Sequence, residues 1–301
     1  GALFLALQLA FRRYHYGDWL PNTYYAKVSS ITLAERIGLG WRYLLASLPK
    51  VGFMPLLGLL PLVLWRRALA LCRITALISA GWLAAVVWMG GDHFYCARFL
   101  LPILPLAALA FFEETARLLL PRIPPERRLL PLPLLGVLLG ALSLTQTDDL
   151  QRRYREISEL RDAKILATFL DRYAEPGDAL AIGAIGYVGY HTKLRIIDMY
   201  GLIDRHIARF GKRNAFTKPG HLVGDEDYVL ARRPRFIHPS FSRSYQNLLH
   251  DERFLSTYQQ IRLEFPDRMR KALWVRKDRF LPDIPLPSEP ALGPLIHLAP
   301  E

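Results

Sequence analysis

The distribution of charged residues along this chain constrains its fold more than any single motif. Residues 1–150 contain 14 Lys and Arg and 8 Asp and Glu, which leaves 25 and 19 of the totals of 39 and 27 for residues 151–301. The chain is 51% hydrophobic with a mean hydropathy of +0.13 and a net charge of +12, an unusual combination for one soluble domain. The apolar content argues against disorder. The pattern predicts a membrane-embedded first half and a soluble second half.

Four stretches of the first half contain no charged residue: 51–65, 74–91, 99–112 and 129–147. A helix needs roughly 20 apolar residues to cross a bilayer, and flanking arginines can extend a shorter one. With an apolar run that ends at Phe11, the sequence predicts about five spans within 1–148, in an α-helical transmembrane bundle. The alternative is a set of buried helices in a soluble protein. Because the chain opens inside the first run without a Met, we expect that this span is truncated.

The basic residues of the first half predict its orientation. The short loops 66–73 and 113–128 are rich in arginine, which is typical of cytoplasmic loops. Because spans alternate in direction, loops 12–50 and 92–98 and everything after residue 148 are expected on the extracytoplasmic face. The two loops and the C-terminal domain would then share one face of the membrane.

The first of these outer loops combines groups that bind sugars and phosphates. Residues 12–27 read RRYHYGDWLPNTYYAK, with turn-forming pairs at 17–18 and 21–22. Tyr25 can stack on a sugar ring, Asn22 can hydrogen-bond to hydroxyls, and Lys27 can hold a phosphate. The alternative is an aromatic belt at the membrane interface followed by a turn.

The second outer loop places three ionisable residues at the expected membrane boundary. Residues 90–102 read GGDHFYCARFLLP and include Asp92, His93 and Arg98. Arg98 can bind a phosphate at headgroup depth, while Asp92 can act as a base or position Arg98. The alternative is a helix cap with an arginine that extends to the interface.

These two loops resemble the bacterial polytopic glycosyltransferases of the GT-C class, and most of all the terminal β-(1→2)-arabinofuranosyltransferase group. The matching residues of the first loop are Asp18, Leu20, Pro21, Asn22, Thr23, Tyr25, Ala26 and Lys27. Those of the second are Gly90, Gly91, Asp92, Arg98, Leu100, Leu101 and Pro102. The segments GAIGYVGY and IIDMYGLIDRHIAR, further along the chain, are similar to the distal domain of that group.

The resemblance implies a sugar transfer, with arabinofuranose as the suggested sugar. The donor would be a polyprenyl-phosphate sugar, and the acceptor an envelope glycan or glycolipid on the outer face of the bacterial inner membrane. The resemblance also places the catalytic carboxylate upstream of residue 1. The catalytic residue is therefore unknown in this chain, and Asp18 and Asp92 are the remaining candidates. The donor site is expected to comprise Lys27, Arg98, His93, Asn22 and Tyr25.

Residues 149–301 predict a small extracytoplasmic α/β domain. A helical pattern at 151–174 precedes buried strands at 179–182, 194–199 and 235–238, and a helix is expected at 225–231. The segments 261–265 and 273–275 read as a pair of strands. A proline-rich tail begins at residue 281.

Polar residues gather where the second of these strands ends. Asp198, Tyr200, Asp204 and Arg205 lie there, at the kind of strand end where α/β proteins bind ligands, so they are candidates for acceptor binding. The nearby Gly183, Gly186 and Gly189 have a spacing that differs from the dinucleotide-binding fingerprint, which disfavours a nicotinamide cofactor. We expect no resident metal site, because no Cys and His cluster is present, although assistance by a divalent metal is left open.

Two other functions remain to be compared with a transferase. A nucleic-acid binder is excluded, because the positive charge is divided between both halves and no recognition motif is present. The remaining alternative is a non-catalytic membrane protein whose outer domain binds a glycan or a protein partner.

Overall fold

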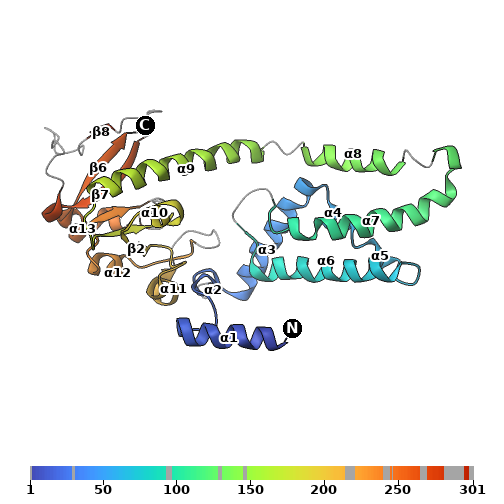
Figure 1. Ribbon diagram of the computed structural model, residues 1–301, viewed down its shortest axis with the longest axis horizontal. Coiled ribbons are helices and arrows are strands. Elements are labelled where there is room, and N and C mark those ends of the chain that lie inside the picture. Colours follow the sequence, from blue (N-terminus) through green and yellow to red (C-terminus); the bar gives the residue numbers. More distant parts are fainter. Residues whose placement is uncertain are drawn as a thin grey trace. The chain divides into compact units, whose positions relative to one another are not determined.

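The structure, a computed structural model, describes residues 2–28, 31–92, 97–127, 131–144, 148–213, 221–239, 245, 247–264, 270–280 and 295–297. The chain forms two compact units (Figure 1). We call Ile31–Glu156 the helical unit, and Gly1–Ser30 together with Ile157–Glu301 the sheet unit. The first 30 residues thus belong with the C-terminal domain, whereas the boundary predicted from the sequence lay near residue 148.

The helical unit contains α3 (Leu33–Ser47), α4 (Met54–Leu57), α5 (Leu60–Val63), α6 (Ala70–Met89), α7 (Leu104–Leu119) and α8 (Pro131–Leu144). Short 3-10 turns occur at Pro49–Val51, Leu101–Ile103, Leu120–Arg122 and Pro125–Arg127. Helices α3 and α7 both pack on α6. The packing of α3 on α6 requires Gly40, because a Cβ there would lie 2.2 Å from the carbonyl oxygen of Val87. Leu44, Leu83 and Leu100 form part of the core between these elements.

The predicted five-span transmembrane bundle is wrong. Within the described part of the chain, α6 is the one helix long and apolar enough to cross a membrane, and 33% of its apolar window is buried. The stretch 51–65 is divided into two four-residue helices, α4 and α5, each with a proline, Pro55 or Pro61, near its start. Helix α8 has only 14 residues, and α7 contains the buried Glu114. A run without charge therefore does not by itself predict a helix that crosses a membrane.

The sheet unit is built on a six-stranded mixed sheet with the order β2-β1-β5-β7-β6-β8. The strands are β1 (Ala179–Ile182), β2 (Arg195–Asp198), β5 (Phe236–His238), β6 (Tyr258–Glu264), β7 (Arg270–Arg276) and β8 (Leu295–His297). β1 is parallel to β2 and β5, β7 is antiparallel to β5 and β6, and β8 is parallel to β6. A separate antiparallel pair joins β3 (Lys212–Arg213) and β4 (Val223–Gly224).

The helices of the sheet unit are α1 (Ala2–Tyr16), α2 (Asn22–Val28), α10 (Gly186–His191), α11 (Arg205–Phe210), α12 (Glu226–Ala231) and α13 (Glu252–Thr257), with 3-10 turns at Leu248–His250 and Lys277–Arg279. Helix α9 (Asp148–Tyr173) begins in the helical unit and belongs to the sheet unit from Ile157 onward. The predicted α/β architecture of this domain is confirmed, with strands at or within a few residues of their expected positions. The turn at 266–267 and most of the proline-rich tail, 281–294, lie outside the described residues.

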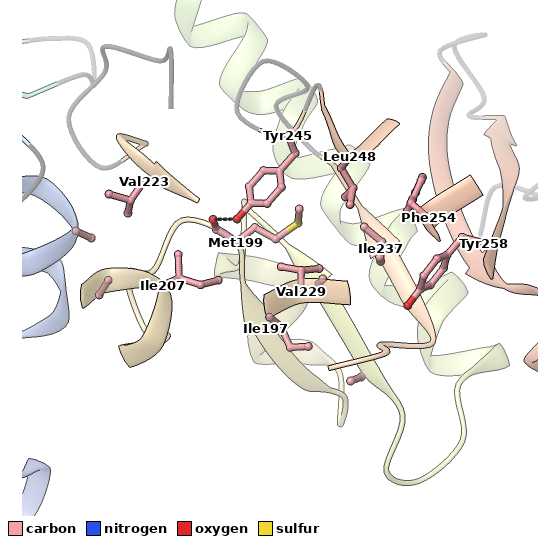
Figure 2. Packing of buried hydrophobic residues seen from close by; sticks show 14 residues of the cluster. Ile197, Met199, Ile207, Val223, Val229, Ile237, Tyr245, Leu248, Phe254 and Tyr258 are labelled. Carbon is pink, nitrogen blue, oxygen red and sulfur yellow. Dashed lines mark hydrogen bonds between the residues drawn. The ribbon is translucent and has the colours of Figure 1, made fainter. Parts of the chain in front are cut away.

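Alternation along the strands creates two cores, one on each face of the sheet. Leu180 and Ile182 pack with α9 and α10 in one cluster. Ala179 and Ala181 lie in the other, which contains Ile197, Met199, Ile207, Val223, Val229, Ile237, Tyr245, Leu248, Phe254 and Tyr258 (Figure 2). Ala26 of α2 is fully buried in this second cluster. The N-terminal segment is therefore part of the core of the sheet unit.

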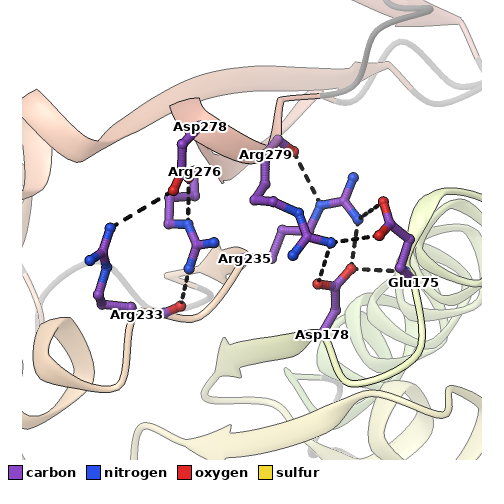
Figure 3. Close-up of polar contacts among 7 residues, drawn as sticks. All are labelled: Glu175, Asp178, Arg233, Arg235, Arg276, Asp278 and Arg279. Atoms are coloured by element: carbon purple, nitrogen blue, oxygen red, sulfur yellow. Dashed lines mark hydrogen bonds and ion pairs between the residues drawn. The ribbon is translucent and has the colours of Figure 1, made fainter.

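An ion-pair cluster joins the ends of α9, β1 and β5 on the sheet unit (Figure 3). Arg235, which precedes β5, has 5% of its side chain exposed and contacts Asp178 at 2.6 Å and Glu175 at 3.1 Å. Its Nε donates to the carbonyl of Arg279, whose guanidinium contacts Glu175 at 2.6 Å and Asp178 at 3.4 Å. These contacts hold the starts of two neighbouring parallel strands together.

Candidate functional site

The first loop is shaped by the end of α1. Gly17 follows the helix with a φ of 69°, the left-handed conformation that ends many helices. Its N–H donates to the carbonyl of Arg13 at 3.1 Å, and the guanidinium of Arg13 donates to the carbonyl of Gly17. This turn carries Asp18 away from the helix axis and toward α11.

The loop between β2 and α11 is shaped by Asp198. Its carboxylate is fully buried and accepts hydrogen bonds from the N–H groups of Tyr200 at 2.9 Å and Ile203 at 2.8 Å. Burial raises the pKa of Asp198, and these N–H donors offset only part of that effect. Gly201, with a φ of 71°, passes so close to α11 that a Cβ would lie 2.6 Å from the N of Ala208. Asp198 therefore determines the loop conformation.

Two more of the predicted acceptor residues also have structural contacts. Asp204 caps the N-terminus of α11 by accepting from the N–H of Ile207 at 3.1 Å, and it accepts from the hydroxyl of Tyr228 at 3.2 Å. The ring of Tyr200 is buried against His221, and Gly183 leaves the space that this ring occupies. Among the four predicted acceptor residues, Arg205 has the exposed functional group, with 58% of its side chain accessible.

The structure brings the first loop and the β2–α11 loop together through Asp18. Its Oδ2 lies 3.0 Å from the Nε of Arg205, and its Oδ1 contacts Arg209. The two arginines are four residues apart, so they project from the same face of α11. Arg209 also lies over the ring of Tyr25, 4.3 Å from its centroid. The side-chain amide of Asn22 donates to the carbonyl of Ile203 at 3.2 Å, which joins the loops at a second point.

A pocket of about 310 Å³ lies where these loops meet, lined by Arg12, Tyr16, Asp18, Leu20, Pro21, Asn22, Leu202, Ile203 and Arg205. Two guanidinium groups, an amide and one carboxylate occupy a lining that also contains apolar and aromatic side chains. Arginine binds phosphate with matched geometry, and the apolar residues can contact a hydrocarbon group. The pocket therefore suits an anionic ligand with an apolar part.

The remaining predicted donor residues do not line this pocket. Lys27 lies half-buried in the last turn of α2. Asp92 and Arg98 belong to the helical unit, where Arg98 donates to both carboxylate oxygens and the Asp92 side chain is 1% exposed. The contacts of Asp92 therefore fit the hypothesis that it positions Arg98 rather than the hypothesis that it acts as a base. His93 lies outside the described residues.

Several residues of the site were not singled out from the sequence. They are Arg12, Tyr16, Leu202, Ile203 and Arg209. The spacing of Arg205 and Arg209 could have indicated that both lie on one face of a helix. Their common partner, Asp18, lies 187 or more positions earlier in the chain, and no local pattern identifies it. Among the described residues, no three His, Cys, Asp or Glu side chains gather as metal ligands.

Comparison with known proteins gives one family match. Residues 150–280 match a family described as a domain of unknown function, DUF8728. This match covers most of the sheet unit but less than half of the chain. No curated protein and no solved structure matches the chain.

Proposed function

We propose that this chain is part of a glycosyltransferase that takes a sugar from a polyprenyl-phosphate donor and transfers it to a cell-envelope glycan or glycolipid. The observation that carries the proposal is the pocket of the sheet unit, in which Arg12 and Arg205 accompany Leu20, Leu202 and Ile203. This combination suits a phosphate attached to a hydrocarbon chain. The resemblance of the two loops to the arabinofuranosyltransferase group suggests arabinofuranose as the sugar.

The exposed apolar surface of helix α1 supports the proposal of a lipid-linked substrate. Leu3, Phe4, Leu7 and Phe11 have between 56% and 74% of their surface exposed, and no described side chain of this helix is buried. The same helix ends in Arg12 and Tyr16, which line the pocket. Apolar side chains followed by basic and aromatic ones are typical of segments at a membrane surface. In this proposal, α1 contacts lipid and the pocket lies at headgroup depth.

The chemistry requires positively charged groups beside the leaving phosphate and a base that removes the proton of the acceptor hydroxyl. Arg12 and Arg205 supply the positive charge, which stabilises the negative charge that develops on the departing lipid phosphate. Removal of the acceptor proton requires a carboxylate in reach of the reacting hydroxyl. Asp18 lies in the pocket, but both of its oxygens contact arginines, so we assign it to positioning rather than to base catalysis.

The proposal includes a location at the bacterial inner membrane, with the sheet unit on its extracytoplasmic face. Helix α6 has the length and composition to cross the bilayer. A reporter fused after Asp149 tests the sidedness. Activity of a reporter that functions only in the cytoplasm would contradict the proposed location.

The transfer reaction is tested with membranes from cells that express the protein from its complete gene, supplied with a prenyl-phospho-arabinofuranose donor that carries a labelled sugar. We expect transfer to envelope acceptors, and a loss of roughly tenfold or more in Arg205→Gln, because one phosphate-binding cation is removed. The matched control is Arg195→Gln, an exposed arginine at the start of β2, which should keep full activity. Equal activity of both variants would contradict a role for the pocket.

One observation favours the alternative of a non-catalytic protein that binds a glycan or a partner. Both candidate catalytic carboxylates, Asp18 and Asp92, have arginine partners. Under this alternative, membranes with the protein show no transfer from any prenyl-phosphate donor, while the purified protein retains an envelope glycan on an affinity column. Transfer that depends on Arg205 would exclude it.

A further inference from the structure

The two arginines that hold Asp18 differ in what else they contact. Arg209 is 27% exposed and lies over the ring of Tyr25, so its position is fixed by packing as well as by charge. Arg205 is 58% exposed, contacts Asp18 through Nε, and lines the pocket. Arg205 can therefore turn to a ligand at lower cost than Arg209.

Asp18 occupies the position that an anionic ligand would take on Arg205. The carboxylate contributes to the lining of the same pocket as Arg12 and Arg205, and only 12% of its side chain is exposed. Its negative charge is therefore poorly screened and opposes the entry of a second anion. A phosphate group that binds in the pocket must either share Arg205 with Asp18 or replace Asp18 there.

We infer that Asp18 is a resident competitor for the phosphate group, and that ligand binding transfers Arg205 from Asp18 to the phosphate while Asp18 stays paired with Arg209. This exchange rests on the proposed function, because it concerns the same pocket. It keeps the largely buried carboxylate paired in both states, which avoids the cost of an isolated buried charge. Arg209 thus assists phosphate binding without contacting the phosphate.

The exchange predicts opposite effects for two substitutions. Asp18→Asn removes the competing charge, so the affinity for phosphate should increase about fivefold or more, the effect of losing one ion pair. Arg209→Gln removes the alternative partner of Asp18, which then holds Arg205 more strongly, so the affinity should decrease about threefold or more. In the double variant, Arg209→Gln should have almost no effect, because the carboxylate through which it acts is absent.

The experiment measures binding of labelled inorganic phosphate, and separately of farnesyl phosphate, to the detergent-purified full chain by equilibrium dialysis. The matched control is Asp227→Asn, which removes an exposed carboxylate that pairs with Arg253 at 2.7 Å in the same unit. We expect the control to bind like the original protein, and both probes to bind more tightly to Asp18→Asn. Tighter binding of farnesyl phosphate alone would overturn the inference, because the competition must concern the phosphate group.

Weaker or unchanged phosphate binding in Asp18→Asn would also overturn it, since Asp18 would then only position the arginines. If Asp18→Asn does not fold, Arg209→Gln decides, because unchanged binding in that variant contradicts the exchange. Failure of the proposed function is recognised separately. Tighter phosphate binding in Asp18→Asn, together with no sugar transfer by the original protein, supports the exchange and contradicts the transferase. Sugar transfer by the original protein without tighter phosphate binding in Asp18→Asn supports the transferase and contradicts the exchange.

Discussion

Replacement of Arg235 by methionine tests the ion-pair cluster that holds β1 and β5 (Figure 3). The change preserves much of the side-chain volume and leaves the carboxylate of Asp178, which is 5% exposed, without its partner at 2.6 Å. Loss of one partner of a buried ion pair costs about 3–5 kcal/mol. Arg279 at 3.4 Å and the N–H of Glu175 at 2.8 Å remain as partners of Asp178, so we expect a loss near the lower end, about 3 kcal/mol.

Hydrogen exchange of the β1 and β5 peptides measures this loss for the sheet unit alone. A loss of about 3 kcal/mol corresponds to roughly 150-fold faster exchange of the most protected amides. Arg279→Met is the control, because its side chain is 39% exposed and should cost at most about 1 kcal/mol. Adding Asp178→Asn to Arg235→Met should recover more than about 1 kcal/mol by removing the buried charge. A cost below about 1 kcal/mol for Arg235→Met, or no recovery in the double variant, would refute the reasoning.

Two further predictions concern the β2–α11 loop and the helical unit. Burial raises the pKa of Asp198, so the folded state keeps the proton of this carboxyl group to a higher pH than the unfolded chain does. The stability that the protonated form contributes is therefore lost as the pH rises from about 4 through the raised pKa. The unfolding free energy of the original protein minus that of Asp198→Asn should therefore fall between pH 4 and pH 7, and a constant or rising difference in denaturant titrations would contradict this. Gly40→Ala should destabilise the helical unit by about 1–3 kcal/mol, because the new Cβ would lie 2.2 Å from the oxygen of Val87 and force α3 away from α6. Unchanged exchange of α6 amides would show that the two helices separate without cost.

The α/β domain could be predicted from the sequence because its signals are local. The buried strand at Ala179–Ile182 and the stop at residues 176–178 lie within a few positions of each other, and strand alternation already separates the two cores. The helices of the first half could not be predicted in the same way. An absence of charge shows that a segment avoids water, but prolines at 55 and 61 and the buried Glu114 determine where helices end and pack.

The candidate site was predicted in its parts but not as a whole. The sequence singled out Asp18, Asn22 and Tyr25 in one loop and Arg205 in another, and assigned them to different substrates. The structure places Asp18, Asn22 and Arg205 around one pocket, and Tyr25 beneath Arg209, the second partner of Asp18. It also shows that Asp198 and Asp204 satisfy backbone N–H groups. An Asp in the sequence can cap a helix or bind a ligand, and only its contacts in the structure distinguish the two roles.

The sequence by itself determined the existence of the α/β domain and the chemistry available in its loops. Both follow from interactions between residues close together in the chain, namely alternation, helical spacing and turn formation. Only the tertiary structure decided that the first 30 residues complete this domain and that Asp18 lies between Arg205 and Arg209. That pairing joins residues more than 180 positions apart through the packing of α2 on α11 and the burial of Ala26, and such a contact leaves no periodic pattern in the sequence.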